Sequence, residues 1–353
     1  MPLRTAPSTV VDPRLTALRR FAASITVFTV VGHLWLGFEQ AYLTPVAGVL
    51  TAYLISLLLE ALDSVAAGRR PRYLDSVSAF VNFLLPAHIA GLACAMLLYG
   101  NESLWPTIFA ATVAASGKYL IRVRVGGARR HVFNPSNLGI SVTLICFSWV
   151  SIAPPYEFTE NVRGPLDWLI PLAILVAGSM INGKLTRRMP LIAGWVGGFV
   201  LQAVLRAVLF HDALASALLV LVGVAFVLFT NYMITDPGTT PTTPRGQVAF
   251  GVSAALVYGA LVVAHVSFGL FFALTLTCAG RLVLLVVGER RAAARRSGQP
   301  VTTDPALPEP AAPEPVSAQP GVREPVGAQP AAPEPVGGTA EPVVPVPVGR
   351  GAS

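Results

Sequence analysis

The chain has 353 residues, of which 54% are hydrophobic and only 12% are charged. Soluble domains usually carry roughly 25% charged residues, so this composition excludes a soluble globular protein and indicates a multi-pass membrane protein. The formal net charge is +7, but the Lys and Arg residues stand in short clusters between apolar runs, which is typical of membrane topology rather than of a nucleic-acid-binding face. We therefore expect contact with membrane lipid and none with nucleic acid.

Apolar runs follow a polar segment at residues 1–20, which we expect to be cytoplasmic. Most of these runs approach the roughly 20 residues that a helix needs to cross about 30 Å of hydrocarbon. They predict an all-α fold with about ten transmembrane helices in two five-helix halves, which together form a membrane domain at 21–288. The runs are 21–38, 45–62, 81–99, 104–121, 137–153, 166–181, 190–209, 213–234, 248–265 and 267–288.

The basic residues orient these helices. Alternate connecting segments are rich in Lys and Arg, whereas the others hold almost none, so the positive-inside rule puts the basic segments in the cytoplasm. An even number of spans then leaves both termini cytoplasmic, in the plasma membrane. The basic clusters are Arg69, Arg70 and Arg72; Lys118, Arg122, Arg124, Arg129 and Arg130; Lys184, Arg187 and Arg188; Arg245; and Arg290, Arg291, Arg295 and Arg296.

Residues 289–353 change character, from a basic stretch to a segment rich in Pro, Ala, Val, Gly and Glu. A ten-residue repeat begins at Glu314, Glu324 and Glu334. Such a density of Pro disfavours helix and sheet, so we expect a disordered, partly polyproline II tail. It acts either as a spacer or as a docking segment.

A Pro-interrupted polar segment, TNYMITDPGTTPTTPRGQVAFG, lies at 230–251 between two long apolar runs. Pro237 has no N–H to continue a helical ladder, so the arriving helix must end near Thr235 and Asp236. Hydroxyls, free amides and one carboxylate then gather at the mouth of two helices, where a polar or anionic ligand can bind. Asp236 either caps this break or binds the ligand. The candidate binding residues are Thr235, Asp236, Pro237, Gly238, Thr239 and Thr240.

A second interruption precedes the predicted helix at 137–153. Asn134 suits a helix cap and Pro135 suits the first helical turn. Paired interruptions in the two halves of a membrane protein point to a site built between broken helices. The simpler interpretation is two capped helix starts beside ordinary loops. The candidate binding residues here are Asn134, Pro135, Ser136 and Asn137, with Lys118 and Arg122 nearby as partners for a phosphate.

These motifs resemble those of a known family. ITDPGTTPTTPRGQ and FNPSNLG resemble segments of the RnfD/NqrB-type membrane proteins, which belong to the Rnf electron-transport complex and to the sodium-pumping NADH:quinone reductase. RFAASITV, GHLWLGFEQAY, LLPAHIAGLACAMLLY, HVFNPSNLGI and FTNYMITDPGTTP together are more similar still to the Rnf-D-like UnbU membrane proteins that accompany enediyne biosynthesis. The resemblance extends from about Arg19 to Arg281 and implies a ten-helix redox protein that supports natural-product biosynthesis.

The RnfD/NqrB-type proteins carry covalent flavin mononucleotide (FMN) on a Thr in a Ser-Gly-Ala-Thr-like motif. No such motif occurs here, so a covalent flavin is not expected. The resemblance still implies a non-covalent flavin, FMN or riboflavin, at the two breaks, where helix starts, hydroxyls, Lys118 and Arg122 suit a phosphate.

Two functions follow from the same residues. The first is an electron-transfer component that exchanges electrons with a soluble redox partner or pathway enzymes on the cytoplasmic side. The second is a transporter for a small solute or a pathway product, with a role in self-resistance. The sequence shows no hydrolase triad, Walker loop or metal-ligand cluster, so a self-sufficient enzyme is not expected.

Overall fold

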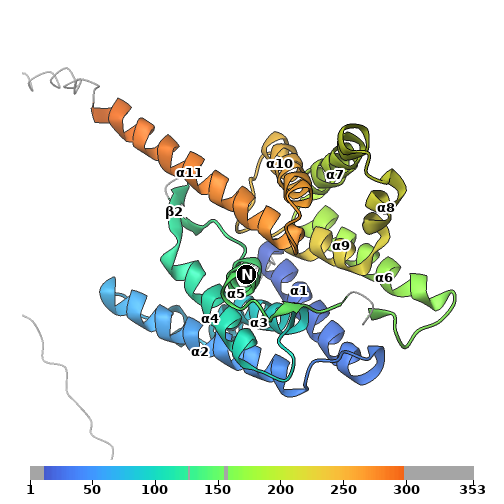
Figure 1. Ribbon diagram of the computed structural model, residues 1–353. Coiled ribbons are helices and arrows are strands. Elements are labelled where there is room, and N and C mark those ends of the chain that lie inside the picture. The colour runs from blue at the N-terminus through green and yellow to red at the C-terminus, as the bar shows by residue number, and fades with distance from the viewer. Residues whose placement is uncertain (1–11, 126–127, 155–157, 298–353) are drawn as a thin grey trace, which may run out of the picture. The chain divides into compact units, whose positions relative to one another are not determined.

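The computed structural model describes residues 12–125, 128–154 and 158–297. All of them belong to one compact unit, Met1–Gln299, and the second unit, Pro300–Ser353, lies outside the described residues. The predicted disordered tail falls almost entirely in that second part. The description below concerns the first unit, which is almost wholly helical, as the composition predicts (Figure 1).

The first half of the described chain contains five long or medium helices and two short antiparallel strand pairings. Its elements are α1 Pro13–Val31, η1 Gly32–Leu36, α2 Leu43–Ala66, η2 Arg72–Leu74, α3 Val77–Leu97, β1 Leu98–Tyr99, α4 Trp105–Leu120, β2 Arg122–Val125, β3 Ala128–His131, α5 Pro135–Cys146 and β4 Ser151–Ile152. Strand β1 pairs antiparallel with β4, and β2 pairs antiparallel with β3, with Arg122 opposite His131.

The second half is helical throughout. Its elements are α6 Leu166–Met180, η4 Ile181–Leu185, α7 Met189–Phe210, α8 Leu214–Leu219, η5 Val220–Val222, α9 Val224–Leu228, η6 Phe229–Met233, α10 Pro244–Val263 and α11 Gly269–Ser297. Helix α1 runs between the elements of the two halves and contacts both α3 and η4 (Figure 1).

Seven helices of the described chain are long and apolar enough to cross a membrane, and an eighth span results if one bent pair counts as a single crossing. Helices form at all ten predicted positions, but ten spans are not confirmed. Helices α4 and α5 have 16 and 12 residues, which is short of the roughly 20 required. The bent pair joins Leu214–Val222 to Val224–Met233 at an angle of 59°.

Helix starts follow a shared local rule. Asp12, Asn134 and Thr243 each place a side-chain oxygen where it accepts a backbone N–H of the following turn, and each stands immediately before a Pro. A cap satisfies N–H groups that a helix start leaves free, and Pro at the first position loses no hydrogen bond. The predicted cap at Asn134 is therefore confirmed.

Two helix boundaries differ from the sequence prediction. Helix α1 begins at Pro13, not near residue 21, because Asp12 caps it and its basic first turns continue the helix. Helix α11 continues past residue 288 to Ser297, so residues 289–297 are helical and not part of a disordered tail. Ala and Arg, which dominate that stretch, are among the best helix formers.

Small residues allow close helix crossings. A Cβ on Gly48 of α2 would lie 2.7 Å from the carbonyl oxygen of Gly91 in α3, and one on Gly194 of α7 would lie 2.5 Å from that of Val248 in α10. Close backbone approach of this kind is how helices associate in a bilayer, where the hydrophobic effect gives little drive.

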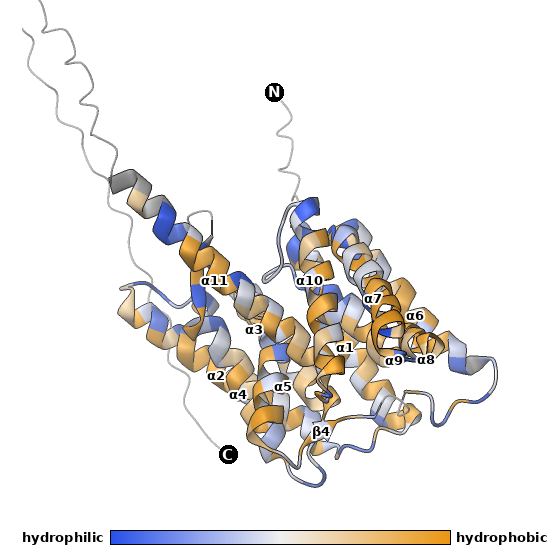
Figure 2. Cartoon of the chain, turned by 45° about the horizontal axis from the view of Figure 1, so that its top comes forward, coloured by the Kyte–Doolittle hydropathy of each residue, from blue (hydrophilic) through white to orange (hydrophobic). Residues whose placement is uncertain are grey.

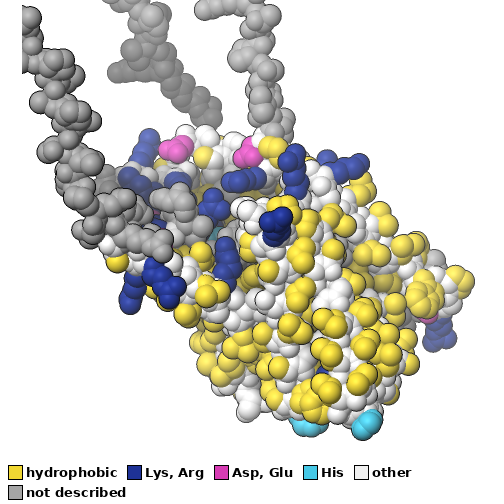
Figure 3. Space-filling view, turned by 90° about the horizontal axis from the view of Figure 1, so that it is seen from above, with side chains coloured by type: hydrophobic (Ala, Val, Ile, Leu, Met, Phe, Trp, Pro, Cys, Tyr) yellow, Lys and Arg dark blue, Asp and Glu magenta, His cyan; other side chains and the backbone are white. Residues whose placement is uncertain are grey.

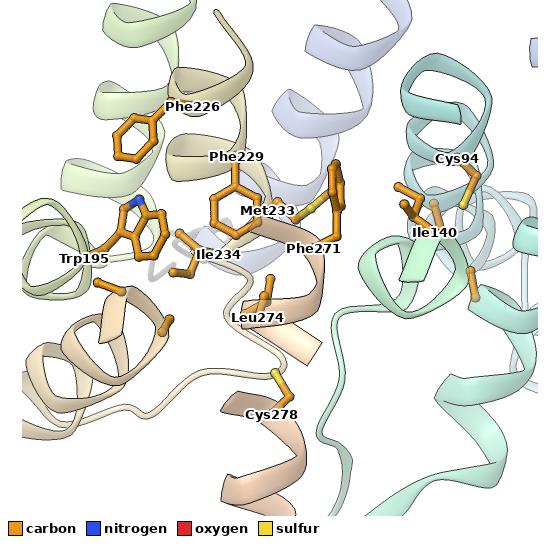
Figure 4. Close-up of a cluster of buried hydrophobic side chains, with 14 of the residues drawn as sticks. Cys94, Ile140, Trp195, Phe226, Phe229, Met233, Ile234, Phe271, Leu274 and Cys278 are labelled. Carbon is orange, nitrogen blue, oxygen red and sulfur yellow. The ribbon is translucent and has the colours of Figure 1, made fainter. Parts of the chain in front are cut away.

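The largest buried cluster joins both halves. Trp195 stacks on Phe226 with ring centroids 5.6 Å apart and donates from Nε1 to Thr230 at 2.9 Å. Figure 4 shows these rings beside Phe229 and Phe271, with Ile140 of α5 in the same cluster. Large apolar side chains on the outside of α2, such as Leu50 and Leu54, are exposed, and Figure 2 colours much of this helix as hydrophobic. This is expected of a surface that faces lipid.

Basic residues collect at one end of the bundle, which we call the basic end and define by Arg69, Arg72, Arg122 and Arg188. Figure 3 shows Lys and Arg side chains gathered there, above a mostly hydrophobic surface. Arg14 near the start of α1 lines a cavity at this end, and α11 reaches it where Arg281 contacts Thr239. The described chain therefore begins and ends at the same end of the bundle.

Candidate functional site

The two Pro interruptions lie side by side at the basic end. The Asn134 amide donates from Nδ2 to the carbonyl oxygen of Met233 at 3.0 Å. His131, just before the first break, places Nε2 3.9 Å from Oδ2 of Asp236 in the second. A Cβ on Gly238 would lie only 2.7 Å from the same His131 nitrogen. Interruptions about a hundred residues apart in the sequence thus form one structure.

The first break is a capped helix start that also ties two helices together. Oδ1 of Asn134 accepts from the Asn137 amide N–H at 3.0 Å and from the Ser136 hydroxyl at 2.9 Å. The Asn137 side chain donates to the carbonyl of Phe271 and to the hydroxyl of Thr275, both in α11. Asn137 therefore links α5 to α11.

The second break follows a π-helical turn, η6, and closes on itself. The Asp236 carboxylate accepts from the Gly238 N–H at 2.9 Å and from the Thr239 hydroxyl at 3.2 Å. The Thr240 hydroxyl donates to the Asp236 carbonyl at 2.7 Å, and that of Thr235 donates to Asn231 at 2.8 Å. These three threonines are nearly fully buried, so their hydroxyls shape the turn.

Two arginines bind the carbonyl groups of this turn. Arg188, which immediately precedes α7, donates from Nη1 to Pro241 and from Nη2 to Pro237. Arg281 of α11 donates from Nη1 to Thr239 at 2.6 Å. The turn contains several Pro and Thr residues whose carbonyls find no helical partner, and the guanidinium groups satisfy them.

A cavity of about 740 Å³ opens between the two halves, next to both breaks. One part of its lining is apolar and rich in aromatic side chains, including Phe21, Phe28, Phe158, Phe229, Tyr232 and Phe271. Its other part is polar and strongly basic. The charged and titratable residues there are Arg14, Lys118, Arg129, Arg130, His131, Arg187, Arg188 and Asp236. The cavity therefore suits an amphipathic molecule with a negative charge at one end.

We call the six cations Arg14, Lys118, Arg129, Arg130, Arg187 and Arg188 the cavity cluster. Asp236 is the one carboxylate among the described lining residues. Burial lowers the pKa of His131, and Lys118 and Arg122 reinforce this against the opposing effect of Asp236. No salt bridge joins the cavity cluster to a carboxylate within the described part of the chain.

A second basic group, which we call the paired cluster, consists of Glu60, Asp63, Arg69, Arg72 and Arg122. Glu60 is fully buried and contacts Arg69 at 2.7 Å and Arg72 at 2.5 Å. Asp63 contacts Arg69 at 2.6 Å and Arg122 at 3.5 Å. Each guanidinium in this cluster therefore meets a carboxylate, and the contacts fasten the connection between α2 and α3 to the end of α2.

Seven of the twelve predicted binding residues line the cavity, namely Lys118, Asn134, Pro135, Ser136, Asp236, Pro237 and Gly238. Four of the others do not line the cavity and instead form hydrogen bonds within the two breaks or to neighbouring helices. They are Asn137, Thr235, Thr239 and Thr240. Arg122 belongs to the paired cluster, where its guanidinium stacks over the Tyr119 ring at 4.7 Å. Arg122 and the three threonines do not line the cavity, and their role in ligand binding stays a prediction.

The sequence prediction missed Arg14, Arg130, His131 and Arg188. Arg14 stood in a segment assigned to the cytoplasm, Arg130 and Arg188 were counted only as topology signals, and His131 was not considered. No local pattern distinguishes a cation that faces a cavity from one that faces water. The Arg-Arg dipeptide before a Pro-started helix, at 187–188, was the available hint, because it stands at the basic end of the other half.

Comparison with known proteins adds no further identification. No protein-family model matches the chain, and no curated protein shows a significant match to it. The resemblance to RnfD/NqrB-type proteins therefore rests on the motifs quoted above. The structure shows a helical protein with several helices that are long and apolar enough to span a membrane, and a basic, amphipathic cavity next to its two Pro interruptions.

Proposed function

We propose that this protein is a membrane-embedded electron-transfer component that holds a non-covalent flavin in the cavity between its two halves. The observation that carries the proposal is the cavity itself, which combines an aromatic part with a cationic end beside both interruptions. The motif resemblance to the RnfD/NqrB-type family supports the same function. It also suggests that the electrons serve enediyne biosynthesis in the plasma membrane.

The donor set of the cavity fits a flavin. Planar aromatic walls such as Phe28 and Tyr232 suit a flat heteroaromatic ring, and Asn134 and Ser136 suit hydroxyls of a sugar-like chain. Lys118 and Arg188 would hold an anionic end. When bound, a flavin supplies one-electron and two-electron transfer. The protein's own residues bind it, orient it and exclude water with the apolar side chains of α1 and α3.

The basic end would face the cytoplasm under the positive-inside rule. A soluble redox partner or pathway enzyme would then approach the exposed arginines around the cavity, among them Arg129 and Arg130. A covalent flavin forms no part of the proposal, because the Ser-Gly-Ala-Thr-like motif is missing from the sequence.

A transporter is the second candidate, and one observation favours it. The bent pair that ends in η6 turns by 59° beside Gly223, and its residues Ala225 to Met233 form one wall of the cavity. Broken helices around a central site are the moving parts of many transporters. In this function the cavity would hold a small anionic solute or a pathway product.

A visible spectrum separates the two functions. The full-length protein, purified in mild detergent and incubated with riboflavin or FMN, should retain an equimolar yellow chromophore after desalting. Acid denaturation should release all of it, because the attachment is non-covalent. A protein that stays colourless with both flavins would overturn the electron-transfer proposal. Uptake of labelled solute by proteoliposomes would then test the transporter.

A further inference from the structure

The cavity cluster contains a buried guanidinium that the protein satisfies only in part. Arg188 is 5% exposed. Its Nη1 and Nη2 donate to Pro241 and Pro237, but the Nε–H is buried and has no partner among the described residues. A buried hydrogen-bond donor without a partner costs free energy, more so when it is charged. Arg188 itself lines the cavity, so its positive charge acts on the space where a ligand would bind.

Lys118 supplies a second cation to the same cavity from the opposite half. It stands in the last turn of α4, and among the described residues its ammonium group makes no hydrogen bond or salt bridge. Both cations line the same cavity from different elements, and Asp236, the carboxylate among the described lining residues, already accepts hydrogen bonds within its turn. The cavity therefore carries positive charge without a paired counterion. Retaining such a charge in an apolar bundle costs free energy unless a ligand neutralises it.

We propose that the cavity binds a phosphate-bearing ligand, with Arg188 and Lys118 as the residues that hold the phosphate. A phosphate monoester carries nearly two negative charges and three strong acceptor oxygens, which matches the guanidinium and ammonium groups that line this cavity. Within the flavin class this predicts selection of FMN over riboflavin. That last step rests on the proposed function, whereas the phosphate site itself does not.

The test compares two flavins that differ only in the phosphate. Flavin fluorescence quenching would measure Kd for FMN and for riboflavin with full-length protein in nanodiscs of zwitterionic lipid. We expect FMN to bind at least about tenfold more tightly than riboflavin. Lys118→Met and Arg188→Gln should weaken FMN binding by about tenfold each while leaving riboflavin binding unchanged.

Arg70→Gln is the matched control, because Arg70 is exposed at the same end and does not line the cavity. It makes the same change in net charge and should not alter either Kd. Arg188→Gln also removes contacts with the Pro237 turn, so gel filtration must show that it is folded. Lys118→Met breaks no hydrogen bond and keeps the test decisive if the Arg188 variant fails.

The outcomes separate the two proposals. Equal affinity for FMN and riboflavin would overturn the phosphate site and leave the flavin function standing. If neither flavin binds, calorimetry with inorganic phosphate and with short-chain phosphatidic acid decides between a free phosphate and a lipid headgroup. Binding of either one, lost in Lys118→Met, would support the phosphate site without the flavin. Absence of all four would overturn both proposals.

Discussion

The paired cluster and the cavity cluster lie at the same end of the bundle and contain similar side chains, but they differ in neutralisation. In the paired cluster each guanidinium meets Glu60 or Asp63 within 3.5 Å. The six cations of the cavity cluster have only Asp236 as a carboxylate beside them among the described lining residues, and Asp236 already accepts hydrogen bonds within its own turn. The number of arginines alone therefore does not identify a binding site. The cavity cluster differs from the paired cluster, which has a structural role, because its cations lack paired carboxylates.

The largest effect is expected for Glu60→Gln, which tests whether the paired cluster stabilises the fold. Removal of this fully buried carboxylate charge would leave Arg72 without a carboxylate partner and Arg69 with Asp63 alone. We expect the free energy of unfolding to fall by about 2–4 kcal/mol, less than for a fully buried pair because both arginines partly reach solvent. Denaturant titration in detergent would measure this, with the exposed Asp75→Asn as control. An unchanged free energy of unfolding would show that the paired cluster does not stabilise the fold.

Lys118→Met should raise the free energy of unfolding, the opposite of the effect expected for Glu60→Gln. The substitution removes a cation without a partner and places an apolar side chain of similar length in the cavity wall. We expect the ligand-free protein to become more stable by about 1–2 kcal/mol, while phosphate binding weakens. Opposite effects on stability and binding are typical of binding sites. Destabilisation of the ligand-free protein would mean that Lys118 has a structural role.

Asp236→Asn tests the single carboxylate of the cavity among the described lining residues. The amide keeps an oxygen that can accept from the Gly238 N–H, so the turn should persist and membrane abundance should be normal. The loss of a negative charge next to the ligand should make FMN binding roughly 1 kcal/mol more favourable, which lowers the Kd about fivefold. Asp236→Ala is the control, since it also loses the cap and should reduce abundance. An unchanged affinity for FMN in Asp236→Asn would show that Asp236 only holds the turn together and does not act on the ligand.

The smallest effect concerns pH. The pKa of His131 in the fold lies below its ordinary value because the ring is buried. The unfolded chain then binds the proton more readily, so stability should fall as the pH drops below about 6.5 toward the folded pKa. Lys118, Arg122 and Asp236 are the charged groups acting on this ring.

A melting curve of ligand-free protein between pH 7.5 and pH 5.5 would show a loss of a few degrees. His131→Gln should flatten this dependence, and the exposed His211→Gln should not. A pH dependence that survives in His131→Gln would assign it to another group.

Much of the fold could be predicted locally. The apolar runs predicted helices at all ten positions, and the Asn134–Pro135 cap followed from side-chain chemistry within one turn. The number of crossings could not be predicted as well. Helix α4 gives way to strand β2 after Leu120, and helix α5 ends at Cys146, inside the apolar run that predicted it. Hydropathy marks where a stretch is apolar and not where a helix ends.

The candidate site divides in the same way. The sequence by itself determined where the helices break, since Pro135 and Pro237 act on their own neighbours through missing N–H groups and steric clash. Only the tertiary structure decided that these breaks meet and that Arg188 and Lys118 share a cavity while Arg122 joins Asp63. Charge neutralisation depends on distances between elements remote in the chain, and the strength of a charge pair depends on its separation and its burial. No local pattern encodes either quantity.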